Sequence, residues 1–95
     1  MSKHPLREAA KGRPCTIRLL SICNRDPETT VLCHLPGPGV GIKADDRHAA
    51  IGCSACHDAV DHRTKTRFFT KEELKLEFLD AVIVTQKIWI KEGRM

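Results

Sequence analysis

Residues 51–62, IGCSACHDAVDH, contain two cysteines, two histidines and two aspartates within twelve positions. Cys53 and Cys56 have the C-x-x-C spacing of many zinc sites, in which cysteine thiolates are preferred ligands. Cys15 and Cys23 form a second, wider pair upstream. We predict that the four thiolates hold a structural Zn²⁺ in a closed tetrahedral site.

These cysteines have two alternative interpretations. Free cysteines can simply be small core residues, and C-x-x-C can serve redox chemistry, although no βαβ pattern surrounds it here. An odd number of cysteines in a reducing compartment favours metal ligation over disulfides. Cys33 is left over: it either replaces one of the four ligands or lies in the core of its strand.

The histidines indicate a second kind of chemistry. If residues 54–62 form a helix, His57 and Asp61 are four positions apart and share one face. An imidazole and a carboxylate suit Mg²⁺, Mn²⁺ or a similar divalent ion. His34 falls at the end of a predicted strand, where it could be a general base for water. Any one histidine is more often a plain surface residue, so the hypothesis depends on the combination.

The elements that position these residues can be predicted from local patterns. A basic stretch with Pro5, Gly12 and Pro14 predicts a mobile or loosely docked arm with room for one helical turn. Turn residues and β-branched runs define the segments that follow. We expect the arm over 1–14, a short strand and turn over 15–23, a strand over 29–35, a surface loop over 36–46, an extended segment over 48–52 and helices over 54–62 and 71–92.

The last helix has the clearest signals. Thr70 and Glu73 form a capping box, and Gly93 lies where a helix end is usually closed. Its apolar face is predicted to be mostly core, with a partner-binding or membrane-surface helix as the weaker alternative. The residues assigned to this face are Leu74, Phe78, Leu79, Val82, Ile83, Trp89 and Ile90.

Length and composition limit the class of protein. A length of ninety-five residues predicts one domain. Hydrophobic residues make up 41% of the chain and aromatic residues only 4%. This composition predicts a thin aliphatic core that a structural metal would help to stabilise. The chain has no apolar run long enough for a membrane span, and its start lacks the apolar centre of a signal peptide. We therefore expect a cytoplasmic protein.

The net charge of +4 is unevenly distributed. Two basic clusters would suit a polyanion such as DNA, although an ordinary solvated surface explains them equally well. The clusters are Lys3, Arg7, Lys11, Arg13 and Arg18, and Arg63, Lys65, Arg67 and Lys71.

A strand histidine, a loop and then C-x-x-C-H opening a helix resemble the HNH (His-Me finger) endonucleases. The segments AAKGRPCTIR, CNRDPETTVLCH, IGCSACHDAVDHRT and TQKIWIKEG are more closely similar to the YbcO-like group of small lambdoid phage and prophage proteins regarded as nucleases. The resemblance implies a treble-clef-like ββα-metal fold. It also implies that the protein acts inside a bacterial host cell. It further implies that His34 is the general base and His57 a metal ligand, with Asp61 where some HNH enzymes have another histidine ligand.

This chain departs from the HNH pattern at two positions. The residue before the base is often a metal-binding acid or histidine, and here it is Cys33. The motif's middle asparagine, which normally pins the loop, is His48, so either His48 or the nearby Asp46 would have that role.

Together these expectations describe a small α+β protein over residues 1–95, with a two-stranded hairpin and a helix around structural Zn²⁺ and a long C-terminal helix. The expected function is cleavage of DNA phosphodiester bonds with a second divalent ion such as Mg²⁺. The rival hypothesis is a non-enzymatic zinc module that binds DNA or a protein partner. It explains the cysteines and the charge, but it leaves His34, His57 and Asp61 without a role.

Overall fold

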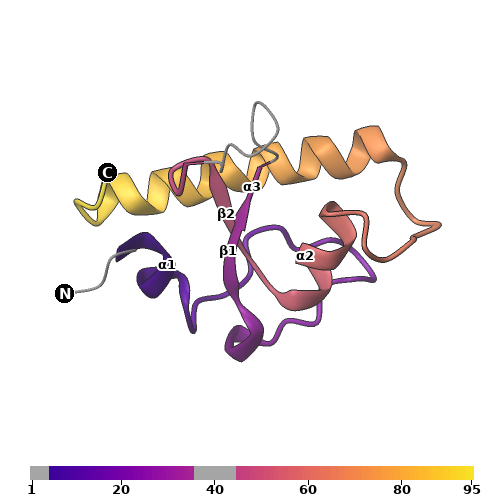
Figure 1. Cartoon of the computed structure of the whole chain (residues 1–95), viewed down its shortest axis with the longest axis horizontal. Helices are drawn as coiled ribbons and strands as arrows, with labels where there is room; N and C mark the ends of the chain where they lie inside the picture. The colour runs from indigo at the N-terminus through magenta and orange to yellow at the C-terminus, as the bar shows by residue number, and fades with distance from the viewer. Residues whose placement is uncertain (1–4, 36–44) are drawn as a thin grey trace.

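The computed structural model describes residues 5–35 and 45–95. A short hairpin and two small helices lie along one side of a long C-terminal helix, so the architecture is α+β (Figure 1). The elements are α1 (Pro5–Ala10), a 3-10 turn (Pro27–Thr29), β1 (Val31–His34), β2 (Ala49–Gly52), α2 (Ser54–Val60) and α3 (Lys71–Lys91). None of the described helices is long and apolar enough to cross a membrane.

Strands β1 and β2 pair in antiparallel fashion, with Val31 opposite Gly52 and His34 opposite Ala49. Because side chains alternate across a sheet, the hairpin separates two apolar clusters. Cys33 and Ala50 belong to the larger cluster, which also contains the predicted zinc ligands. The smaller cluster, on the α1 side, comprises Leu6, Ala10, Leu32, Ala49, Ile51 and Trp89.

The free edge of β2 is covered by threonine hydroxyls. The Ile51 amide donates to the Thr85 hydroxyl at 3.0 Å, and the Ile51 carbonyl accepts from the amide and the hydroxyl of Thr16, each at 2.7 Å. Thr85 is fully buried on α3. These bonds satisfy backbone groups that a two-stranded sheet would otherwise leave unpaired, and they tie the hairpin to α3.

Helix α3 begins as predicted. Thr70 and Glu73 make both hydrogen bonds of the capping box, and the helix ends with Glu92 as its C-cap and a left-handed Gly93 at φ 73°. Its buried residues are Leu74, Phe78, Ala81, Val82, Thr85 and Trp89.

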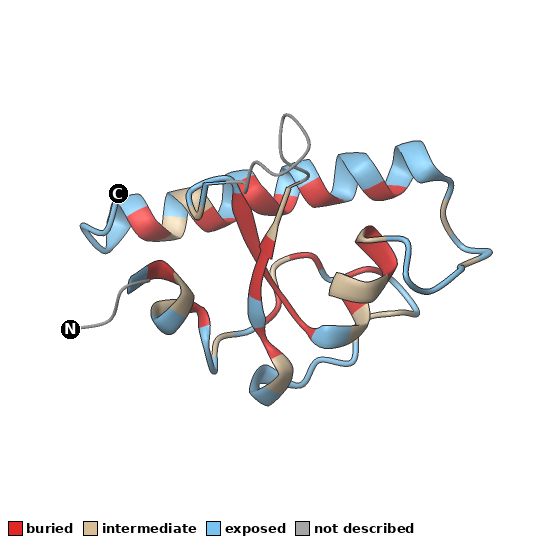
Figure 2. Cartoon of the chain, in the orientation of Figure 1, coloured by how far each residue is buried: buried red, intermediate tan, exposed pale blue. Residues whose placement is uncertain are grey.

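The predicted apolar face of α3 was partly wrong, because Leu79, Ile83 and Ile90 are exposed. Seven large residues cannot share one face at 100° per residue: Leu79 follows Leu74 by five positions and falls well outside the core stripe. Figure 2 shows α3 buried along the side that faces the hairpin and exposed along the other.

The predicted strand within residues 15–23 was also wrong. The segment is a series of turns, with left-handed backbone at Arg18 (φ 49°) and Ser21 (φ 66°). Eight extended residue steps would separate Cys15 and Cys23 by about 26 Å, whereas turns bring their sulfurs together. Ile17 and Leu19 are buried in the larger cluster, so their apolar character reflects burial and not a strand.

The N-terminal arm is docked from Pro5 onward. Leu6 and Ala10 of α1 pack in the Trp89 cluster, and Arg13 pairs with Glu92 through two hydrogen bonds of 2.5 and 2.7 Å. The Arg13 guanidinium also lies 5.0 Å from the centre of the Trp89 ring, a favourable cation–π distance. Residues 1–4, and most of the predicted loop over 36–46, fall outside the described residues.

Candidate metal centre and candidate active site

The four predicted zinc ligands meet at one point. Cys15 and Cys23 come from the loop after α1, and Cys53 and Cys56 from the start of α2. Their sulfur atoms all lie within 4.8 Å of one another, and the sulfurs of Cys23 and Cys53 are 3.8 Å apart. Zn–S bonds of 2.3 Å in a tetrahedron separate neighbouring sulfurs by about 3.8 Å. The donor set therefore fits Zn²⁺ with little adjustment.

The first cysteine of each pair accepts a hydrogen bond from the backbone amide three residues further along the chain. The amide of Arg18 donates to the Cys15 sulfur at 3.4 Å, and the amide of Cys56 donates to the Cys53 sulfur at 3.4 Å. The second contact makes Cys53 the N-cap of α2. Amide donors at a helix start favour an anionic sulfur, which is the form that binds a metal.

The thiols also influence one another. A hydrogen bond from Cys56 lowers the pKa of Cys15 to about 4 and raises the pKa of Cys56. Burial raises the pKa of the Cys23 thiol. Four thiols this close together cannot all ionise unless a cation lies among them. A bound metal ion would allow all four to be thiolates.

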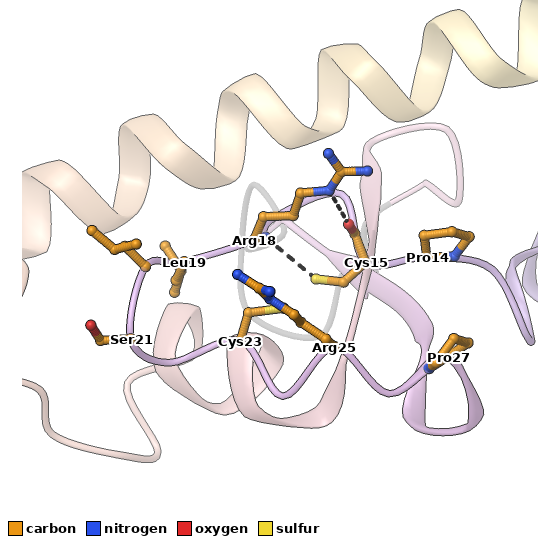
Figure 3. A pocket seen from close by; sticks show the side chains of 9 residues that line it. Pro14, Cys15, Arg18, Leu19, Ser21, Cys23, Arg25 and Pro27 are labelled. Carbon is orange, nitrogen blue, oxygen red and sulfur yellow. Dashed lines mark hydrogen bonds between the residues drawn. The ribbon is translucent and has the colours of Figure 1, made fainter.

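A pocket of about 390 Å³ opens beside the thiols and is lined by Cys15, Cys23, Arg18 and Arg25 among others (Figure 3). The Arg18 side chain donates to the Cys15 carbonyl at 2.9 Å. Within residues 5–35 and 45–95, neither arginine pairs with a carboxylate. Their positive charge would offset a zinc centre with four thiolates, which carries a net charge of −2.

Cys33 lies outside this cluster and is a core residue. It is fully buried, and burial raises the pKa of its thiol to about 12. Its sulfur lies 3.9 Å from the Gly52 carbonyl. Its sulfur is not one of the four that lie within 4.8 Å of one another, so the structure favours the core alternative for this fifth cysteine.

His34, the predicted general base, contacts a carboxylate. Its Nε2 lies 2.6 Å from Oδ1 of Asp46, and Arg7 of α1 donates to the same oxygen at 3.1 Å. Burial opposes ionisation of Asp46, but the hydrogen bonds from His34 and Arg7 outweigh it and lower the pKa of this carboxyl. An ionised Asp46 requires the proton on Nε2, which leaves Nδ1 of His34 free to accept another.

His57 and Asp61, the predicted ligands of the second ion, are also together. Nε2 of His57 lies 3.1 Å from Oδ2 of Asp61, and both side chains are roughly one-quarter exposed. Arg63 approaches the same carboxylate oxygen at 3.6 Å. Among the described residues, the four cysteines are the group of three or more ligands placed to hold a metal. The His57–Asp61 pair remains a prediction of a two-ligand site.

The two departures from the HNH pattern can be examined directly. The side chain of His48 is exposed, and its backbone carbonyl accepts from the Leu35 amide at 3.0 Å. This bond extends the pairing of the two strands by one residue beyond His34, while Asp46 supplies the side-chain contact to His34. Local sequence patterns could not predict the contribution of Arg7, because this residue lies in α1, thirty-nine positions before Asp46.

Sequence comparisons identify the family of this chain. Residues 4–94 match the family model described as "Putative nuclease YbcO". The chain belongs to the YbcO family. It is 45% identical over 91 residues, 93% of each chain, to proteins named putative nuclease YbcO from Escherichia coli K12 and from Enterobacteria phage 82.

A solved structure shows that relatives share the fold. A putative bacteriophage protein from Escherichia coli K-12 MG1655 superposes with a TM-score of 0.79 at 43% identity. The match covers 94% of this chain and all of the other.

Proposed function

We propose that this protein is an HNH-type endonuclease that hydrolyses DNA phosphodiester bonds with the help of a divalent ion. The YbcO family name supports a nuclease. The order of β1, β2 and α2, with His34 on the first strand and His57 on the helix, agrees with the ββα-metal arrangement that the HNH resemblance implies.

The contact of His34 with Asp46 is the observation that carries the proposal. Asp46 fixes the tautomer of His34, so that Nδ1 takes the proton from an attacking water. Arg7 keeps Asp46 ionised by donating to the same oxygen. A histidine oriented by a carboxylate is a common way to build a general base, and a zinc module has no need of it.

The His57–Asp61 pair would hold the divalent ion. One imidazole nitrogen and one carboxylate oxygen, adjacent and partly exposed, fit Mg²⁺ or Mn²⁺ with waters in the remaining positions. When bound, the ion supplies charge stabilisation at the phosphoryl and leaving oxygens.

The cations available to phosphates differ from the two predicted clusters. Arg7, Lys11 and Arg13 are engaged by carboxylates of the protein itself. Lys65 and Arg67, in the segment between α2 and α3, have no such partner among the described residues. We assign the backbone-binding role mainly to this second segment.

Metal-dependent nicking of supercoiled plasmid tests the proposal. The zinc-loaded protein should nick DNA only after Mg²⁺ or Mn²⁺ is added. His57→Ala should be much less active, and a higher ion concentration should restore part of the activity, because one of two ligands remains. His62→Ala, which removes an exposed histidine from the same segment, is the matched control and should nick normally. DNA binding without nicking in any ion would instead support the non-enzymatic zinc module.

A further inference from the structure

Helix α3 has a second apolar stripe on the side away from the hairpin. Leu76, Ile83 and Ile90 are 62%, 51% and 62% exposed, and Leu79 is 37% exposed. The first three recur every seven residues, and Leu79 falls between Leu76 and Ile83. At 100° per residue the four side chains lie within about 60° of one another, opposite the buried face. We call these four residues the outer stripe.

The spacing of the outer stripe is that of a helix-pairing seam. Apolar residues repeating every seven positions, with one between, form the contact line of two-stranded coiled coils. From Leu76 to Ile90 the stripe extends about 21 Å along the helix. The outer side of α3 in Figure 2 is exposed along this length. Isolated exposed apolar residues are ordinary, but four of them on one line of a helix, interrupted only by Gln86, mark an interaction surface.

The charges beside the outer stripe favour a second copy of α3 as its partner. The first half of α3 carries an excess of acids, whereas the second half carries Lys87 and Lys91. Asp80 and Glu73 lie on the same flank of the stripe as these lysines, by helical geometry. If a second α3 lies antiparallel with Ile83 opposite Ile83, Asp80 meets Lys87 and Glu73 meets Lys91 of the other copy. A parallel pair would place like charges together.

We propose that two copies of this chain pair through the outer stripe, with their α3 helices antiparallel around Ile83. Such an interface is two-fold symmetric, since each copy contributes the same residues. Four apolar residues per copy cover less than the area of a standard stable interface, so the dimer should form and dissociate with concentration. The acids along the first half of α3 disfavour an anionic membrane surface as the occupant.

Sedimentation equilibrium of the full chain over a concentration series tests this pairing. The wild type should pass from monomer to dimer. Ile83→Glu places two carboxylates at the centre of the seam and should raise the dimer dissociation constant by roughly a hundredfold or more. Val84→Glu is the matched control. Val84 is 46% exposed but lies about 100° around the helix from Ile83, so this variant should still dimerise.

Charge reversal distinguishes the antiparallel register from other contacts. Asp80→Lys and Lys87→Asp should each weaken the dimer, and the double variant should recover most of the loss because the pair is restored in reverse. A wild type that stays monomeric throughout the series would overturn the proposal. So would a dimer that Ile83→Glu leaves intact, one that Val84→Glu disrupts equally, or charge reversals whose effects only add.

Discussion

At the scale of single residues, the five cysteines divide into four ligands and one core thiol. The sequence predicted the four but left Cys33 open, because spacing alone cannot reveal which thiol is enclosed by a strand pair. Burial answers the question. Cys33 is completely enclosed between the hairpin and the larger apolar cluster, and the other four sulfurs face one another.

Zinc content should follow this division. We expect one Zn²⁺ per chain in the wild type and in Cys33→Ala, and loss of the metal together with most of the helical signal in Cys53→Ser. Metal binding and folding are coupled in small domains of this kind. Elemental analysis and circular dichroism on the same samples would measure both. A well-folded wild type without metal, or a Cys33→Ala variant that loses it, would contradict the assignment.

Asp46 should matter for both stability and rate. Its pKa is lowered in the folded protein, so it binds fewer protons than in the unfolded chain at acidic pH. The stability it contributes is present above about pH 4 and is lost as the pH falls through the carboxyl range. Asp46→Asn should therefore flatten the decline in unfolding free energy on acidification.

The same substitution should reduce plasmid nicking by roughly tenfold to a hundredfold, less than loss of His34 itself, because the base remains but its tautomer is no longer fixed. Urea unfolding across pH and initial nicking rates would provide the two readings. A variant with the wild-type pH dependence and the wild-type rate would show that Asp46 does not position His34.

At the scale of elements, local signals were reliable where the local chain determines its own structure. The capping box at Thr70 and Glu73 predicted the start of α3, and the β-branched run predicted β1. The turns over 15–23 could not be predicted in the same way, because they depend on four sulfurs meeting and on Ile17 and Leu19 filling the space beneath them. Leu79, Ile83 and Ile90 were wrongly assigned to the core because periodicity identifies apolar residues without showing what covers them.

Gly52 shows how closely β2 approaches its neighbours. A Cβ atom at this position would lie 2.6 Å from Cδ1 of Ile17 and 2.9 Å from the sulfur of Cys33. Gly52→Ala should lower the free energy of unfolding by about 1–3 kcal/mol through overpacking. Ile17→Val removes the nearer atom, so the double variant should be less destabilised than the sum of the two single changes. Urea denaturation of the wild type, the two single variants and the double variant would measure this coupling. If the changes in unfolding free energy simply add, the backbone moves to relieve the contact instead.

At the scale of the whole molecule, the net charge of +4 overstates the charge that is free to bind a polyanion. Much of the N-terminal cluster is neutralised internally, whereas Lys65 and Arg67 are free of carboxylates in the described structure. Composition alone cannot make this distinction, because it depends on which carboxylates the fold brings to each cation.

DNA affinity should therefore fall steeply with salt, as counterion release requires. Lys65→Glu together with Arg67→Glu should weaken binding to all sequences alike and reduce the salt dependence. Lys11→Glu alters a cation that Glu8 already contacts at 3.3 Å, and it should have a smaller effect. Fluorescence anisotropy with labelled duplexes over a salt series would measure these differences. An affinity independent of salt would point to a protein partner instead.

The central claim, that His34 is the general base of a nuclease, is tested most directly by the plasmid-nicking rate of His34→Ala. Removal of a general base costs on the order of a hundred- to ten-thousand-fold in rate. We predict that nicking falls below detection while zinc content, helical signal and DNA affinity stay near wild-type values, and that His62→Ala nicks normally. A wild type that cuts DNA and a His34→Ala variant that cuts it equally fast would contradict the mechanism.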